Sequence, residues 1–181
     1  MAFHHVAFGA KDLAATHEFY TKIMGFRLAK VVTSPTPGEH GGWAKHVFYE
    51  TGDDGQMIAF WDLHDAKIGT DWKADHAASL GLPEWVNHVA FDSPSLDELA
   101  ARRTRWQENG ITVLEVNHEW CTSIYTVDPN GIMVEFCCTT RAFTAAEIEA
   151  AARLVADPAP HLESPPRPTV HKPLRKAGVA A

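Results

Sequence analysis

The sequence predicts an α+β fold built from two tandem βαβββ modules. The tetrapeptide His-Val-Ala-Phe occurs at residues 5–8 and again at residues 88–91, and an internal repeat of this kind indicates a duplicated structural unit. A second set of matches, at a constant offset of 76 residues, pairs Tyr49 with Tyr125, Gly55 with Gly131 and Ala59 with Glu135. We expect one curved mixed sheet around a central metal cleft, because one module alone exposes a sheet face that it cannot bury.

The first module begins with a strand at the first tetrapeptide and continues with a helix over residues 12–24. Asp12 is placed to accept hydrogen bonds at the helix N-terminus, and Gly25 is placed to end the helix in a left-handed conformation. Residues 26–32 form an apolar run that follows the helix and predicts a strand. The order strand, helix, strand is therefore predicted from local signals alone.

The second module repeats this order after the second tetrapeptide. Ser95 and Glu98 form a capping-box pattern that opens a helix over residues 95–109, and Gly110 ends it. An apolar strand follows at 111–116, and Asp128-Pro129-Asn130-Gly131 has the composition of a tight turn between the last two strands.

The remaining residues are predicted to be accessory to the paired modules. Thr144 and Glu147 form another capping-box pattern at the start of an alanine-rich helix. The proline-rich end of the chain is expected to be extended and without regular structure. The predicted boundaries are 1–143 for the paired domain (module one 1–63, linker 64–84, module two 85–143), 144–157 for the C-terminal helix and 158–181 for the tail.

Composition narrows the possible functions. The chain has 181 residues, 45% of them hydrophobic, and a formal charge of −7, which fits a globular protein and excludes the basic surface of a nucleic-acid-binding protein. No apolar run is long enough for a membrane span. The N-terminus lacks the pattern of a secretory signal, and the three cysteines do not form a disulfide framework, so a cytoplasmic location is expected.

Eleven histidines raise the question of metal or proton chemistry. His5 and His88 open the two equivalent strands, so a pseudo-twofold arrangement would place them across one cleft. Glu135 is a carboxylate in an apolar strand and needs a partner if it is buried. Two histidines and one carboxylate form the facial triad that suits Fe(II). The alternative, left open by these residues alone, is that the histidines are structural and Glu135 faces solvent.

The sequence resembles the vicinal oxygen chelate superfamily in three features. They are the repeated strands, the helix motif Asp12-Leu13…Phe19-Tyr20…Met24-Gly25-Phe26, and the segment Ser123-Ile124-Tyr125…Asp128-Pro129-Asn130-Gly131…Glu135. That superfamily contains glyoxalase I, type I extradiol dioxygenases, fosfomycin-resistance transferases, methylmalonyl-CoA epimerase and bleomycin-binding proteins. The resemblance covers about residues 3–140. It implies the paired-module fold and a divalent metal, most simply Fe(II), with Mn(II), Ni(II) or Zn(II) as alternatives, bound by His5, His88 and Glu135.

The resemblance also bears on the reaction. Glyoxalases and epimerases usually add a fourth protein ligand at the position of Ala59, and alanine cannot bind a metal. The remaining set of three protein ligands is similar to the ligand sets of the extradiol dioxygenases and fosfomycin transferases. Extradiol enzymes have a tyrosine ten residues before the ligand glutamate, which Tyr125 matches, and a catalytic histidine upstream, for which His118 is the nearest candidate.

We therefore expect an extradiol-type dioxygenase that binds dioxygen and a catecholic, or other vicinal-dioxygen, aromatic substrate. His118 and Tyr125 are the expected catalytic residues. His46, Trp61 and His64 are candidates for contacts with the substrate. The alternatives are another metal-dependent enzyme of the superfamily (a lyase, isomerase, epimerase or thiol transferase) and a drug-binding resistance protein. A homodimer, with no nucleic-acid or membrane partner, is expected by analogy with the superfamily.

Overall fold

The structure of the chain is a computed structural model that describes residues 3–37, 41–52 and 55–174. Residues 175–181 of the predicted tail lie outside this range. The chain divides into two compact units, one formed by residues 1–91 and 126–134 and the other by residues 92–125 and 135–181. No helix in the described ranges has the length and apolar character needed to cross a membrane.

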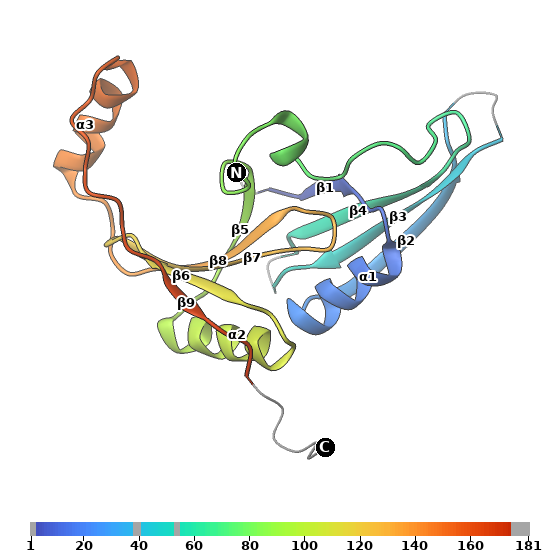
Figure 1. Cartoon of the computed structure of the whole chain (residues 1–181), viewed down its shortest axis with the longest axis horizontal. Helices are drawn as coiled ribbons and strands as arrows, with labels where there is room; N and C mark the ends of the chain where they lie inside the picture. The colour runs from blue at the N-terminus through green and yellow to red at the C-terminus, as the bar shows by residue number, and fades with distance from the viewer. Residues whose placement is uncertain (1–2, 38–40, 53–54, 175–181) are drawn as a thin grey trace. The chain divides into compact units, whose positions relative to one another are not determined.

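The first unit contains a four-stranded sheet with the order β1–β4–β3–β2 (Figure 1). Its strands are β1 (His5–Gly9), β2 (Arg27–Pro35), β3 (Trp43–Glu50) and β4 (Met57–His64). Strands β1 and β4 are parallel, whereas β4, β3 and β2 pair in antiparallel fashion. The sheet is therefore mixed, as predicted for one βαβββ module.

One face of this sheet is covered by the predicted first helix. The helix consists of α1 (Leu13–Glu18) followed by a π-helical turn, η1 (Phe19–Ile23). The side chain of Asp12 accepts a hydrogen bond from the Ala15 N–H, and Gly25 has a φ of 80°, so both predicted ends of the helix are confirmed.

The core of the first unit is aromatic. Tyr20, Tyr49 and Phe60 are each fully buried, and the rings of Tyr20 and Phe60 lie 4.6 Å apart. Aromatic side chains of this size bury a large apolar area and therefore contribute strongly to stability. These large aromatic side chains thus form the packing contact between the first helix and its sheet.

A buried polar cluster joins the turn at residues 128–131 to α1. The carboxylate of Asp128 accepts hydrogen bonds from the Tyr20 hydroxyl (3.0 Å), from the Asn130 side chain (3.0 Å) and from the backbone N–H groups of Asn130 and Ile132. Asn130 also donates to the Thr16 hydroxyl. This cluster explains why residues 126–134, which belong to the second module in sequence, group with the first unit.

The second sheet has five strands in the order β5–β8–β7–β6–β9. They are β5 (His88–Asp92), β6 (Val113–Asn117), β7 (Cys121–Val127), β8 (Met133–Thr139) and β9 (Thr169–His171). In the linker, Ala78–Leu80 form a short 3-10 turn, η2. The first eight strands of the chain thus form two sheets, one from each predicted module. The prediction of a single continuous sheet was wrong, because these described strands hydrogen-bond only within their own module.

The second unit repeats the helix-on-sheet packing. Helix α2 (Leu96–Glu108) begins at Ser95, whose hydroxyl accepts a hydrogen bond from the Glu98 N–H, as predicted. Its buried Trp106 contacts the Phe136 ring with a centroid distance of 5.6 Å. The guanidinium of Arg102 also lies over Phe136, at 4.1 Å.

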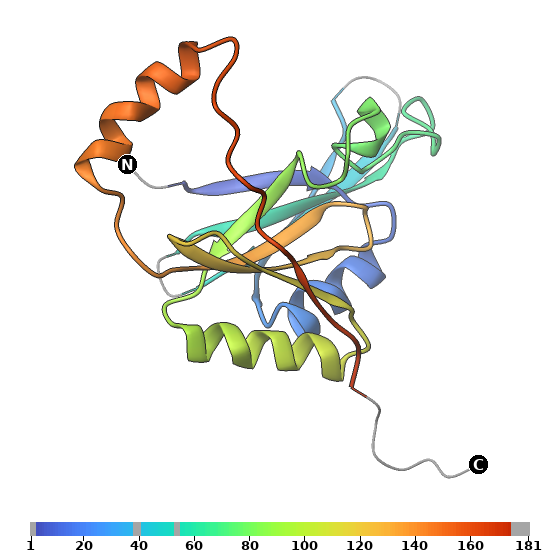
Figure 2. The same cartoon turned by 60° about the vertical axis from the view of Figure 1, so that its left-hand side comes forward.

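The C-terminal segment differs from its prediction in one respect. Helix α3 (Ala145–Ala156) has both halves of the predicted capping box. The proline-rich tail, expected to lack regular structure, adds β9 antiparallel to β6, with Leu114 opposite Val170 (Figure 2). The physical reason is that β6 would otherwise be an edge strand with unpaired N–H and C=O groups, which the tail satisfies.

Candidate functional site

The open face of the first sheet carries a histidine and aromatic cluster. His46 on β3 is directly opposite Trp61 on β4, and their rings stack with centroids 3.8 Å apart. Phe48 is opposite Ala59 and lies 4.1 Å from the His46 ring. The structure therefore brings together two of the three residues predicted to contact substrate, His46 and Trp61.

His5 belongs to the same cluster. Its ring lies 5.5 Å from Phe48 and 6.0 Å from His46, and its Nδ1 is 2.8 Å from the Nδ1 of His4. Burial and the neighbouring His5 lower the pKa of His46. The Nε2 of His46 is buried without a hydrogen-bond partner among the described residues, so this nitrogen faces other rings rather than solvent.

His64 lies apart from these residues. Its ring stacks on Trp43 with centroids 3.9 Å apart, and its Nε2 is 2.9 Å from a carboxylate oxygen of Asp62. Successive residues of a strand point to opposite faces of the sheet, so His64 and Trp61, three residues apart on β4, face opposite sides. The structure does not place the predicted contact residue His64 with the other two.

His88, the second predicted metal ligand, is fixed by its neighbours. Its Nδ1 lies 2.9 Å from the carbonyl oxygen of Trp85. Because a carbonyl only accepts, Nδ1 carries the hydrogen and donates it, and the lone pair is then on Nε2. Metal-binding histidines are typically oriented in this way, by a hydrogen bond from the ring nitrogen that does not bind the metal.

A cavity of about 310 Å³ adjoins His88. Its lining is mostly apolar, includes Val6, Met57 and Phe91, and does not include His5. The volume lies at the lower end of the ~300–1,000 Å³ range of small-molecule sites. A small aromatic ligand is compatible with these surroundings.

The second unit brings the other three predicted residues together. Glu135 on β8 is 5% exposed, and it shares a hydrogen bond with the hydroxyl of Tyr125 on β7. The same hydroxyl lies 3.0 Å from the Nε2 of His118. His118, Tyr125 and Glu135 therefore form a continuous line of polar contacts.

Electrostatics keep the proton on the Tyr125 hydroxyl. Burial raises the pKa of Tyr125, and the Glu135 carboxylate raises it further, whereas a hydrogen bond with Ser123 lowers it. Near neutral pH, Tyr125 is consequently a neutral hydrogen-bond donor.

Ser123 and Cys121 share these surroundings and were not predicted as site residues. Both are buried, and burial raises the pKa of the Cys121 thiol to about 12, so it is a thiol and not a thiolate near neutral pH. Ser123 and Cys121 precede Tyr125 by two and four residues. Because alternate residues of a strand point to the same face, this spacing could have predicted that they lie beside Tyr125.

The three predicted metal ligands are divided between the two units, with His5 and His88 in the first and Glu135 in the second. Within residues 3–37, 41–52 and 55–174, no group of three His, Cys, Asp or Glu side chains gathers in an arrangement that could hold a metal ion. The ligand set His5, His88 and Glu135 therefore stays a prediction. The nitrogen and carboxylate donors that it contains are of the kind that suits Fe(II).

Comparison with known families bears directly on these residues. The sequence pattern of the Glyoxalase/Bleomycin resistance protein/Dioxygenase superfamily matches residues 2–136. The chain belongs to this superfamily. Members commonly bind divalent metal ions, and they include enzymes as well as binding proteins without enzymatic activity. A search of curated protein sequences gives no match.

Solved structures show the fold of the superfamily in related forms. A lactoylglutathione lyase from Agrobacterium tumefaciens is 22% identical, with 76% of this chain and 92% of that chain covered and a TM-score of 0.50. TnmS3, an antibiotic-binding protein from Streptomyces sp. CB03234, is 16% identical, with 77% and 97% covered and a TM-score of 0.50. The fosfomycin resistance protein FosX from Listeria monocytogenes is 17% identical, with 81% and 97% covered and a TM-score of 0.50.

These structures confirm the predicted fold class of paired βαβββ-like modules. They include a lyase, an antibiotic-binding protein and a resistance protein, so structural likeness does not choose among reactions. The choice rests on the chemistry of this chain's own residues.

Proposed function

We propose that this chain is an extradiol-type dioxygenase that opens the ring of a catecholic substrate with dioxygen. The observation that carries the proposal is the line of contacts from His118 through Tyr125 to Glu135. It joins an imidazole, a neutral phenol and a buried carboxylate, which are groups that can hold or move a proton next to a bound substrate.

The metal in this proposal is Fe(II), held by His5, His88 and Glu135. Bound iron would supply the open positions at which a substrate with neighbouring oxygens and dioxygen are brought together. The tautomer of His88, fixed by the Trp85 carbonyl, supports its role as a ligand through Nε2. Ala59 supports a three-ligand site, because the equivalent position in the first module has no donor atom.

The proton transfers are assigned to this chain's own side chains. His118 is assigned the transfer of a proton from a substrate hydroxyl and its later return. Tyr125 keeps its proton, since burial raises its pKa. Its hydroxyl therefore donates its one hydrogen to the Glu135 carboxylate and lies 3.0 Å from His118 Nε2, so that it orients both side chains.

The substrate's ring is assigned to aromatic and apolar surroundings. Trp61 and His46 offer stacked rings on the first sheet, and the His88 cavity is mostly apolar. Flat aromatic ligands gain from such surfaces, and the few polar groups fix their orientation.

The test is catechol-dependent oxygen uptake by protein that was purified without oxygen and loaded with Fe(II). The expected result is one dioxygen consumed per catechol and a yellow ring-opened product. The His118→Gln variant should keep its iron and lose turnover, whereas Glu135→Ala should lose iron. Consumption of the hemithioacetal of methylglyoxal and glutathione without oxygen uptake would instead indicate a lyase. Ligand binding that is independent of metal and of Glu135 would indicate a binding protein.

A further inference from the structure

The hairpin turn between β6 and β7 contains a strained residue directly beside His118. Glu119 has a φ of 71°, and across the described part of the chain it is the one residue other than glycine with a positive φ. The N–H of Trp120 donates to the carbonyl of His118 at 2.9 Å, so Glu119 is the centre of a three-residue γ-turn. A γ-turn with a positive φ at its centre is rare and strained, and such a residue persists only where its surroundings hold it.

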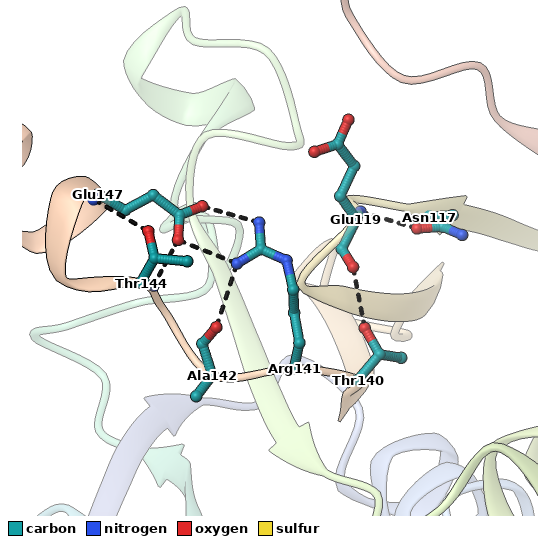
Figure 3. Close-up of polar contacts among 7 residues, drawn as sticks. All are labelled: Asn117, Glu119, Thr140, Arg141, Ala142, Thr144 and Glu147. Carbon is teal, nitrogen blue, oxygen red and sulfur yellow. Dashed lines mark hydrogen bonds and ion pairs between the residues drawn. The ribbon is translucent and has the colours of Figure 1, made fainter.

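Side chains hold this turn at both peptide groups of Glu119 (Figure 3). The Oδ1 of Asn117 accepts from the Glu119 N–H at 2.7 Å, and the hydroxyl of Thr140 donates to the Glu119 carbonyl at 3.0 Å. Glycine adopts a positive φ without steric cost, so a glycine at this position would not need these bonds. With glutamate there, the two bonds offset the cost of its left-handed backbone.

Thr140 is itself fixed by the chain around it. Its backbone N–H and that of Arg141 donate to the carbonyl of Trp120 at 2.8 and 3.2 Å. Both terminal nitrogens of the Arg141 guanidinium contact the carboxylate of Glu147 near the start of α3, at 2.7 and 3.0 Å. The Thr140 hydroxyl is therefore presented to the turn by a segment that is held in place.

The turn determines where His118 points. Its backbone N–H donates to the carbonyl of Cys121 at 2.8 Å and continues the pairing of β6 with β7, so His118 faces the same side of the sheet as Cys121 and Tyr125. Tyr125 lies four residues beyond Cys121, roughly 13 Å at the rise of a strand. The two side chains must extend towards each other to bring His118 Nε2 within 3.0 Å of the Tyr125 hydroxyl, and a small rotation of the turn breaks this contact.

We propose that Thr140 and Asn117 are positioning residues that hold the strained turn at Glu119 and thereby keep the His118 imidazole against Tyr125. The two hydrogen bonds make a fixed support of a hairpin loop that would otherwise relax and let the imidazole swing. The effect on turnover rests on the proposed function, in which His118 transfers a proton. The contact itself lies within one unit of the chain and does not depend on the reaction.

Nuclear magnetic resonance of the metal-free full chain measures the contact through nuclear Overhauser effects between the ring protons of His118 and Tyr125. Thr140→Val keeps the shape and removes the hydroxyl, so it should weaken these effects severalfold, whereas Thr140→Ser keeps the hydroxyl and should retain them. Thr104→Val is the matched control, because it also removes a hydroxyl that donates to a backbone carbonyl at 3.0 Å, but within α2. Unchanged effects in Thr140→Val would overturn the proposal.

The bond to Asn117 is tested by the same measurement. Asn117→Ala removes the acceptor of the Glu119 N–H and should weaken the effects between the two rings. Asn117→Asp keeps an oxygen at this place and should retain them. Effects of equal strength in Asn117→Ala and the unmodified chain would overturn the role of Asn117.

Glycine at position 119 tests the strain. Glu119→Gly should leave the midpoint of urea denaturation unchanged or raise it, because glycine adopts the left-handed conformation without steric cost. Glu84→Gly, at an exposed linker residue outside the left-handed region, should lower the midpoint, since glycine loses more conformational freedom on folding. In the Thr140→Val background, Glu119→Gly should restore the contact of His118 with Tyr125. Equal losses at positions 119 and 84, or no restoration, would overturn the role of strain.

Turnover separates this proposal from the proposed function. In the iron-loaded chain, Thr140→Val should lower kcat about tenfold or more, because a small misplacement of a catalytic group slows the chemical step, with KM and bound iron unchanged. Thr140→Ser and Thr104→Val should keep kcat within a few-fold. A chain that lacks dioxygenase activity but shows the Thr140-dependent contact refutes the proposed function and supports the positioning of His118. A normal kcat in a Thr140→Val chain that has lost the contact overturns its consequence for catalysis.

Discussion

Two tyrosines at equivalent positions of the repeat have different surroundings. Tyr49 is fully buried in the first unit, lies opposite Ile58 and shares a hydrogen bond of 3.2 Å with His17. Tyr125, 76 residues later in the sequence, contacts Glu135 and His118 instead. One tyrosine belongs to the core under α1 and the other to the candidate site.

The turn between the paired strands accounts for the difference. In the first module the backbone N–H of Thr51 bonds to the carbonyl of Gln56, whereas in the second the N–H of Asp128 bonds to the carbonyl of Ile132. The second turn is one residue shorter. A one-residue change of register moves a side chain to the other face of the sheet, so Phe48 faces Ala59 while Tyr125 faces Glu135.

The two copies of the module thus use the equivalent tyrosine differently, one for packing and the other in the candidate site. The first copy has no donor atom at Ala59 and uses its tyrosine for packing. The second has a carboxylate at Glu135 and brings its tyrosine to it. The predictions that follow test whether this division is functional, from the largest expected effect to the smallest.

Replacing Glu135 should have the largest effect. Glu135→Gln keeps the shape and removes the charge that the proposed metal requires, a loss of several kcal/mol in transition-state stabilisation. We expect kcat/KM to fall about a thousandfold or more and bound iron to decrease. Ala59→Ser, at the equivalent position of the first module, should change neither beyond a few-fold. Equal effects at both positions would show that the division between the modules is not functional.

Removing the Asp128 carboxylate should have the next largest effect. Asp128→Ala leaves the Tyr20 hydroxyl and the backbone donors of the turn without their acceptor. The expected cost is about 3 kcal/mol or more of unfolding free energy. Urea denaturation of the metal-free protein measures it.

The control for Asp128 is the other turn. At the equivalent residue, Gly52, no neighbouring group of the described chain comes within 4 Å of the place where an alanine methyl would lie. Gly52→Ala should therefore change the unfolding free energy by less than about 0.5 kcal/mol. A similar loss at both turns would mean that the buried cluster of the second turn has no special role.

The two tyrosines can be compared by the same substitution. Tyr125→Phe removes the hydroxyl that links His118 to Glu135 and should lower kcat about a hundredfold with iron still bound. Tyr49→Phe should leave kcat unchanged and reduce the unfolding free energy by about 1 kcal/mol, since it loses only the hydrogen bond with His17. Steady-state kinetics and urea denaturation of both variants separate the roles, and an inverted pattern would refute them.

Local signals predicted the helices well. Asp12, Ser95 and Thr144 cap their helices as the sequence indicates, because a cap depends on residues within one turn. The contact of Tyr20 with Asp128 and the pairing of β9 with β6 join residues more than 50 positions apart. No local pattern encodes such contacts.

The sequence named the candidate site residues, but their arrangement depends on how the strands pair. Burial of Glu135 and its grouping with Tyr125 and His118 follow from strand alternation once the pairing is known. The sequence does not predict that Tyr49 and Tyr125 point to opposite faces of their sheets. That difference depends on a turn that is one residue shorter in the second module, and the constant offset of 76 residues gives no sign of it. The stacking of His46 on Trp61 likewise depends on the register of β3 and β4.

The smallest expected effect concerns the pH dependence of α3, the element without a counterpart in the first module. The Arg141 guanidinium and the Thr144 backbone and hydroxyl groups lower the pKa of Glu147 from its usual 4.5 to about 2. A carboxyl group whose pKa is lower in the folded state stabilises that state above its unfolded pKa, and this stabilisation is lost as the pH falls through the folded pKa. Helix α3 should therefore fray progressively between about pH 4.5 and pH 2.

Amide hydrogen exchange across α3 measures this fraying. Protection of the first turn should fall as the pH is lowered through that window, after correction for the intrinsic pH dependence of exchange. Glu147→Gln should remove the dependence, because glutamine can still bond to the Thr144 N–H but does not titrate. Glu149→Gln, which alters a carboxylate outside the cap, should retain it. If the Glu147→Gln helix frays with the same pH profile as the unmodified chain, the Arg141–Glu147 contact does not hold the start of α3.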